Sequence, residues 1–260
     1  MDEFSVLIAG GGVAALEAAL TLADVAEGRA RVELLAPEPL FWYRPTSVAE
    51  PFGLGTVRHF DLGLLAARAG AGMTLGAITG VDTDRRLART AAGGTLSYDA
   101  LLIACGAEPM DAVTGALTFR GPADGPRLRA LVEEVEQGSA ERVVFAIPSG
   151  SAWPLPAYEL ALMTARHLVA TGTGQCHVSV VSPELRPLEL FGRAASDAVL
   201  GLLGEAGVAF VGGVRPVGHE AGELTHSDGV IPADRVVALP RLRGPRIDGV
   251  RQTPEGFIPV

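Results

Sequence analysis

The sequence has little cysteine, and its histidines are scattered. Of 260 residues only two are cysteines, which lie far apart without a C-x-x-C motif. This pattern excludes a disulfide framework, and we expect a reducing, cytoplasmic setting. No two histidines share a metal-ligand spacing either, so we predict no metal site and assign no role to four of them: His167, His177, His219 and His226.

Dense basic segments and long apolar segments are also missing. The formal net charge is -9 and no stretch is rich in arginine or lysine, which argues against nucleic acid as a partner and favours small molecules. The apolar start, Phe4 to Ala23, follows two acidic residues and contains Glu17 and three glycines. We therefore interpret it as part of the protein core, not as a secretory or membrane segment. We expect no transmembrane segment, and the sequence leaves open peripheral membrane contact and a homodimer.

The most informative segment that is present lies at the amino terminus. The apolar run Phe4–Ala9 stops at a glycine triplet and is followed by an alanine- and leucine-rich segment from Val13, which predicts the strand, turn and helix of a dinucleotide-binding unit. Gly10 permits the turn, and Gly12 lets the backbone approach a pyrophosphate at the helix N-terminus. Ala15 stands where the pattern prefers a third glycine. A simple turn after a buried strand is the alternative.

The predicted second strand, Arg31–Ala36, ends without the expected acid. A dinucleotide site usually places a carboxylate there to accept hydrogen bonds from a ribose, but the residue is Ala36. Glu38 is the best substitute, and an exposed loop acid is the equal alternative. The aromatic loop that follows, Pro39–Pro45, could contact a ring system while Arg44 reaches a phosphate, or could simply cover a satellite core.

Further along, the pattern predicts a helix and several short strands. The helix covers residues 60–70, and the strands cover 73–82, 87–90, 95–98 and the buried run 100–104. The glycine-rich start, the Tyr43-Arg44-Pro45 loop, this small meander and the Tyr98–Pro109 segment together resemble the FAD half of the pyridine nucleotide-disulfide oxidoreductase superfamily. The resemblance is to the branch of sulfide:quinone oxidoreductases, flavocytochrome c sulfide dehydrogenases and type II NADH dehydrogenases.

This resemblance implies an FAD site. The residues expected to bind FAD are those of the glycine turn and helix start, the end of the second strand, the arginine-proline pair, the start of the meander and the returning strand: Gly10, Gly11, Gly12, Val13, Ala14, Ala15, Ala36, Glu38, Arg44, Pro45, Ala77, Ile78, Cys105 and Gly106. Ala77 or Ile78 would meet the adenine through its backbone, and Arg44 and Pro45 would lie beside the flavin. Cys105 replaces the usual threonine or serine, and we expect a small packing residue there.

The following region predicts a second βαβ unit. Its helices are expected over 126–137, 157–169 and 193–205, and its strands over 142–147, 176–181, 208–211 and 234–239. The predicted fold is therefore α/β, with two Rossmann-like parallel-sheet domains, the second inserted in the first, and small antiparallel meanders. The expected domains are residues 1–112, 113–238 and a return over 239–260.

The loop of the second unit departs from the family pattern. It reads Pro148–Pro156 in place of G-x-G-x-x-G. Pro154 and Pro156 remove backbone donors and Trp153 crowds the approach, which argues against ordinary NAD(P)H binding. The loop also lacks cysteines, which argues against dithiol sulfide oxidation. Glu159 matches the family's Glu-Leu-Ala and is the expected catalytic proton-handling residue, with a first-turn acid stabilised by the helix dipole as the alternative.

Glu255–Val260 resembles the point where family members return to the FAD domain. The family would continue with a Gly-Asp motif and an interface domain, so the sequence is expected to be a fragment or a shortened relative. The predicted function is an FAD-dependent oxidoreductase that passes electrons from a small donor to a quinone or other small acceptor. The alternatives are a non-enzymatic nucleotide- or partner-binding module and an NAD(P)H-using reductase.

Overall fold

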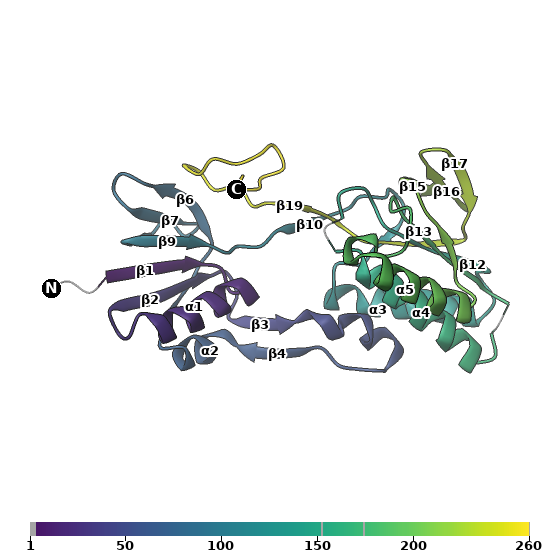
Figure 1. Cartoon of the computed structure of the whole chain (residues 1–260), viewed down its shortest axis with the longest axis horizontal. Helices are drawn as coiled ribbons and strands as arrows, with labels where there is room; N and C mark the ends of the chain where they lie inside the picture. The colour runs from purple at the N-terminus through teal and green to yellow at the C-terminus, as the bar shows by residue number, and fades with distance from the viewer. Residues whose placement is uncertain (1–3, 152, 174, 260) are drawn as a thin grey trace. The chain divides into compact units, whose positions relative to one another are not determined.

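The computed structural model describes residues 4–151, 153–173 and 175–259, which form two compact units. The first unit contains Met1–Tyr43, Arg58–Glu108 and Arg243–Val260, and the second contains Arg44–Val57 and Pro109–Leu242. The bulk of the second unit is thus inserted in the first, as the family resemblance implied (Figure 1). The segment Arg44–Val57 also groups with the second unit.

The first unit is built on a four-stranded parallel sheet. Its strand order is β5-β2-β1-β9, with bounds β1 Phe4–Ala9, β2 Ala30–Ala36, β5 Gly72–Leu75 and β9 Ala100–Ile103. Ala9 pairs with Leu35 on one side and with Ile103 on the other. The carboxyl end of β1 is therefore the topological switch point, where ligands bind in open α/β sheets.

The two faces of this sheet are covered by different layers. Val6 and Ile8 pack with helices α1 (Val13–Val25) and α2 (Leu62–Arg68). Leu7 and Ala9 point the other way, because successive side chains alternate along a strand, and pack with the antiparallel meander β6 (Ile78–Asp82), β7 (Leu87–Thr90) and β8 (Thr95–Ser97). This near-continuous apolar run is what a strand buried on both faces requires.

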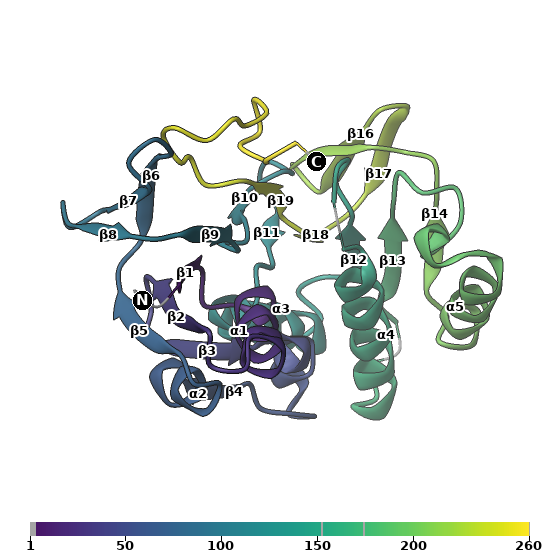
Figure 2. The ribbon, with the colours of Figure 1, turned by 60° about the vertical axis from the view of Figure 1, so that its left-hand side comes forward.

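The second unit repeats the plan around the parallel sheet β11-β18-β12-β13-β14. Val143 and Phe145 pack toward helices α3, α4 and α5, whereas Val144 and Ala146 pack toward an antiparallel sheet. Figure 2 shows α4 alongside β12 and β13. The bounds are β11 Leu117–Thr118, α3 Gly125–Glu136, β12 Arg142–Ala146, α4 Leu155–Ala170, β13 His177–Val181, α5 Arg193–Glu205, β14 Ala209–Val211, β15 Pro216–Glu220, β16 Glu223–His226, β17 Gly229–Pro232 and β18 Arg235–Ala238.

Several local expectations need correction. The strand expected over 73–82 is two strands, β5 and β6, because the chain leaves the parallel sheet at Gly76 and enters the meander at Ile78. The aromatic segment is not only a loop: β3 (Leu40–Tyr43) pairs with β4 (Arg58–Asp61). The next helix begins at Leu62, because the Asp61 carboxylate caps it by accepting from the Leu64 N–H at 2.8 Å.

The segment Arg44–Val57 forms two 3₁₀ turns, η1 (Arg44–Val48) and η2 (Glu50–Phe52). Val48 and Phe52 are buried in the helical core of the second unit. The remaining short elements are η3 (Pro122–Asp124), η4 (Glu189–Phe191) and the two-stranded sheet of β10 (Glu108–Met110) and β19 (Arg241–Arg243).

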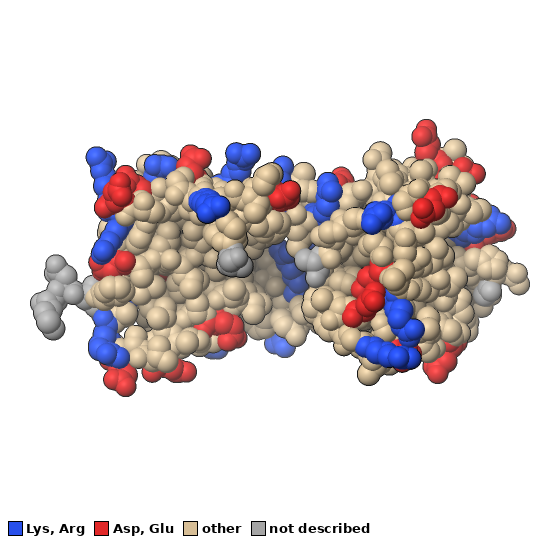
Figure 3. All heavy atoms as spheres, turned by 45° about the horizontal axis from the view of Figure 1, so that its top comes forward, with Lys and Arg blue, Asp and Glu red and all other residues tan. Residues whose placement is uncertain are grey.

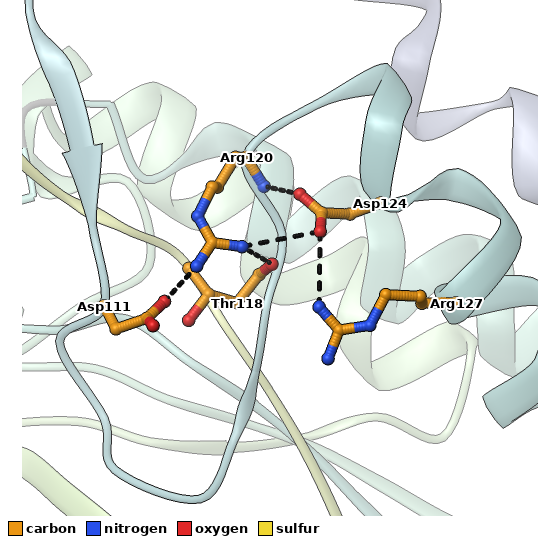
Figure 4. A network of polar contacts seen from close by, with 5 residues as sticks. All are labelled: Asp111, Thr118, Arg120, Asp124 and Arg127. Atoms are coloured by element: carbon orange, nitrogen blue, oxygen red, sulfur yellow. Dashed lines mark hydrogen bonds and ion pairs between the residues drawn. The ribbon is translucent and has the colours of Figure 1, made fainter.

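A polar network holds the crossing segment of the second unit (Figure 4). The buried Asp124 carboxylate accepts from the Arg120 backbone N–H at 2.9 Å and lies 3.5 Å from the Arg127 guanidinium. Arg120 also donates to the Thr118 carbonyl at 3.2 Å and forms an ion pair with Asp111. The network ties the chain before α3 to the start of that helix.

The surface carries charges of both signs. Acidic and arginine side chains are interspersed on the face drawn in Figure 3. Within residues 4–151, 153–173 and 175–259, no helix combines the length and apolarity that a membrane crossing needs. The same described residues include no cluster of three or more histidine, cysteine or acidic side chains that could hold a metal ion.

Candidate functional site

The glycine turn closes the carboxyl end of β1 and has no room for side chains at its first position. Gly10 adopts φ 146°, and its N–H donates to the Leu35 carbonyl at 2.9 Å. A Cβ atom on Gly10 would lie 2.2 Å from the Ala104 carbonyl oxygen. Both the conformation and this approach require glycine. Gly11 is similarly packed, since a Cβ there would lie 2.6 Å from the Leu62 side chain and 2.9 Å from the Ala36 Cβ.

Gly12, by contrast, faces open space. No heavy atom lies within 4 Å of the position that its Cβ would take. It caps α1 without any side-chain hydrogen bond, the first turn contains no acid, and the first helical bond runs from the Leu16 N–H to the Gly12 carbonyl at 3.1 Å. The N–H groups of Val13 and Ala14, both exposed, therefore have no intrahelical acceptor.

We call residues Gly10 to Ala15 the glycine cradle. Free N–H groups and the positive end of a helix dipole suit an anion, and the absent side chain at Gly12 lets it come close. Ala15 is fully buried between α1 and the sheet, where a small residue allows close packing. These residues fit a diphosphate of the kind that a dinucleotide carries.

The end of β9 lies beside the cradle. The Ala104 N–H donates to the Ala9 carbonyl at 2.7 Å, and the Cys105 thiol donates to the same oxygen at 3.3 Å. Burial raises the pKa of Cys105, which keeps the thiol neutral. Cys105 packs with the core between the sheet and the meander, and Gly106 follows it with an exposed backbone at φ 68°.

The residues expected near the ribose and the adenine differ in whether their polar groups are free to bind a ligand. Ala36 is buried, and its carbonyl already accepts from the Gly76 N–H at 2.8 Å. Glu38 is exposed, and no residue in the described ranges hydrogen-bonds to its carboxylate. The Ala77 carbonyl accepts from the Ala91 N–H at 2.9 Å, and the Ile78 side chain is buried. These residues leave Glu38 as the free carboxylate after β2.

The other expected site residues belong to the second unit. Arg44 and Pro45 are exposed at the start of η1. Glu159 is half-buried in α4, and burial raises its pKa. The helix begins at Leu155, so Glu159 lies beyond its first turn. The alternative, in which the helix dipole stabilises a first-turn acid, would instead require Glu159 to lie in the first turn and to have a lowered pKa.

The loop after β12 leads into α4 through two prolines. It starts beside the loop after β13, since the Ile147 N–H donates to the Val181 carbonyl at 2.8 Å. Pro154 is the N-cap of α4 without a side-chain bond, and Pro156 occupies its first turn. Trp153 is 53% exposed, and its ring meets that of Phe191 at 5.4 Å between centroids.

Sequence reasoning missed Phe191 and the contacts of Tyr158, because these partners lie in the loop after β13, far from α4 in the sequence. Tyr158 is fully buried, and its hydroxyl donates to Glu184 Oε2 at 2.8 Å. Ser182 Oγ donates to the same oxygen at 3.3 Å. Burial and this bond raise the pKa of Tyr158. Glu184, the acid that follows β13, is thus engaged within the chain.

Two parallel-sheet units, one carrying a glycine cradle at its switch point, define the class of two-domain dinucleotide-binding proteins. The family model for pyridine nucleotide-disulphide oxidoreductases matches residues 4–240, so the chain belongs to that family. Members of the family are flavoprotein oxidoreductases that bind FAD and NAD(P)H.

Solved structures show the same fold. The sulfide:quinone oxidoreductase from Aquifex aeolicus matches with a TM-score of 0.83 and 21% identity over 93% of this chain and 59% of that chain. NDH2 from Plasmodium falciparum in complex with NADH matches with a TM-score of 0.71 and 13% identity, over 93% of this chain and 56% of that one. The chain therefore spans less than two thirds of these proteins. No curated protein matches it.

Proposed function

We propose that the first unit binds FAD and that the protein is an FAD-dependent oxidoreductase, which passes electrons from a small reduced donor to a quinone or other small acceptor. The observation that carries the proposal is the glycine cradle, where Gly12 has open space and the first N–H groups of α1 lack acceptors. The printed names of the similar structures, a sulfide:quinone oxidoreductase and an NADH complex of NDH2, support the same class of reaction.

The residues of the first unit would have distinct roles. Gly12, Val13 and Ala14 would hold the diphosphate through backbone N–H groups, and Glu38 would accept hydrogen bonds from a ribose. FAD would supply the redox chemistry when bound. The neutral Cys105 thiol would serve packing at the end of β9, because its proton is held by the Ala9 carbonyl.

Two residues of the second unit, Glu159 and Arg44, would have chemical roles of their own. Glu159 would hold or release a proton, since its raised pKa brings the carboxyl group nearer to the working range of a general acid or base. Arg44, an exposed cation that no described residue pairs with, would stabilise negative charge on a bound group. Both roles come from the family resemblance and are part of the proposal.

The test is a spectrum of the purified full-length protein. We expect bound flavin with absorbance at about 450 nm, the region where oxidised flavin absorbs. Anaerobic addition of a panel of donors should bleach it, whereas NADH and NADPH should act slowly or not at all, given Pro154 and Pro156 at the start of α4. A protein that shows no flavin absorbance even after addition of FAD would contradict the proposal.

A second candidate is a non-enzymatic nucleotide- or partner-binding module. The observation that favours it is Ala36, which is buried and apolar where a dinucleotide site needs an acid. The two functions are distinguished by turnover: flavin that is bound but is neither reduced by any donor nor reoxidised by any acceptor would favour the module.

A further inference from the structure

The carboxyl edge of the second sheet carries a surface that the proposed function leaves unused. Ala146 and Val181 are register partners at the ends of β12 and β13, so the loops that follow both strands begin side by side. This edge is where a dinucleotide-binding unit places its ligand. In this chain the edge carries two prolines, an acid that is already hydrogen-bonded, and an aromatic pair.

The prolines and the engaged acid offer little to a nucleotide. Pro154 and Pro156 lack the N–H groups that the start of α4 would otherwise offer to a phosphate. Glu184, the acid after β13, already accepts hydrogen bonds from Tyr158 and Ser182. A ribose or a phosphate would find no free partner of the usual kind at these positions.

The aromatic pair consists of Trp153 and Phe191, and we call it the aromatic corner. The two ring planes meet at 86° with centroids 5.4 Å apart. Trp153 is 53% exposed and Phe191 is 47% exposed, so both rings present surface to solvent. A third ring can then stack on one of them while it meets the other edge to face, and both are arrangements that aromatic rings prefer.

The loop that carries Phe191 is well anchored. Ser196 Oγ donates to the Pro187 carbonyl at 2.6 Å, and Leu188 is buried at φ 51°. The Gly213 N–H also holds the Glu184 carbonyl at 2.9 Å. The Phe191 side of the corner is therefore preorganised, which reduces the entropy lost when a ligand binds.

We propose that the aromatic corner binds an uncharged, planar aromatic group. Leu190, which is 66% exposed and adjacent to Phe191, extends the apolar surface that such a ligand would cover. Pro154 and Pro156 have no N–H groups to donate to a phosphate, so a ligand without a phosphate suits them better. This inference concerns the second unit alone and does not depend on flavin binding by the first.

The test uses N-phenyl-1-naphthylamine, an uncharged aromatic probe whose fluorescence rises in apolar surroundings. We expect saturable binding by the full chain that NADH and ADP-ribose do not reverse. Trp153→Ala and Phe191→Ala should each weaken binding about tenfold, because each removes one ring of the corner. Val169→Ala, which removes an exposed apolar side chain elsewhere in the same unit, should leave the affinity unchanged.

Thermal melts of the variants test the fold, which should persist because Trp153 and Phe191 are exposed. Three results would overturn the proposal: no saturable binding, binding that both ring variants retain, or displacement of the probe by NADH. Light scattering adds a fourth. A dimer that Trp153→Ala converts to a monomer would mean that a second copy of the chain, and no small ligand, covers the corner.

Discussion

Gly10 and Gly12 stand two residues apart in one turn, and we expect their substitution to have opposite consequences. Gly12→Val should leave the fold intact and weaken FAD binding. Gly12 has φ −90°, which any residue adopts, and its Cβ would meet no atom within 4 Å. The new side chain would instead occupy the space above the N–H groups of α1 that a diphosphate needs.

The magnitudes follow from the same contacts. Valine is a poorer N-cap than glycine by about 1 kcal/mol, but it stabilises by about 0.4–1 kcal/mol by restricting the unfolded chain. The free energy of unfolding should thus change by less than about 1 kcal/mol. Loss of one hydrogen bond to a charged phosphate costs about 1.5–3 kcal/mol, which raises the Kd for FAD about 10- to 140-fold.

Gly10→Ala is the matched control. Its Cβ would overlap the Ala104 carbonyl at 2.2 Å, and alanine at φ 146° is strained. We expect a loss of about 3 kcal/mol of stability or more. Flavin fluorescence quenching measures Kd and urea unfolding measures stability. If Gly12→Val keeps full FAD affinity, the assignment of the glycine cradle is wrong.

Three further predictions concern single side chains. Burial raises the folded-state pKa of Glu159, so its neutral form favours the fold, and the protein should lose stability as the pH rises from the ordinary pKa of 4.5 through the raised pKa. In urea unfolding, Glu159→Gln should therefore be more stable than the wild type at pH 7 and equal to it at pH 4. Asp124→Ala should cost about 1.5–3 kcal/mol in urea unfolding, because it removes the buried carboxylate that accepts from the Arg120 backbone N–H and lies near the Arg120 and Arg127 guanidinium groups. Arg127→Ala, at an exposed residue, should cost less than about 1 kcal/mol in the same assay. Equal losses would contradict this account of the network. Burial raises the pKa of both Cys105 and Cys176, so iodoacetamide should label each thiol more slowly at pH 7 than it labels free cysteine. Mass spectrometry measures the labelling, and labelling as fast as that of free cysteine would refute this burial argument.

Much of the architecture follows from local sequence patterns. The apolar run before Gly10 and the helical segment after it predict β1 and α1, because a strand buried on both faces is apolar throughout and glycine permits the turn. The missing N–H donors in the loop before α4 also follow from the sequence, since proline lacks an N–H wherever it stands. The family follows from the same motifs.

Other features arise only when distant segments pack together. The change of sheet at Gly76 depends on which strands pair, and pairing is a long-range choice that local propensity does not encode. Phe191 reaches Trp153, and Glu184 reaches Tyr158, because the parallel sheet brings the ends of β12 and β13 to one edge. The sequence by itself therefore determined the two βαβ starts and the glycines of the first turn. Only the tertiary structure decided what surrounds them, because contacts between loops depend on strand order.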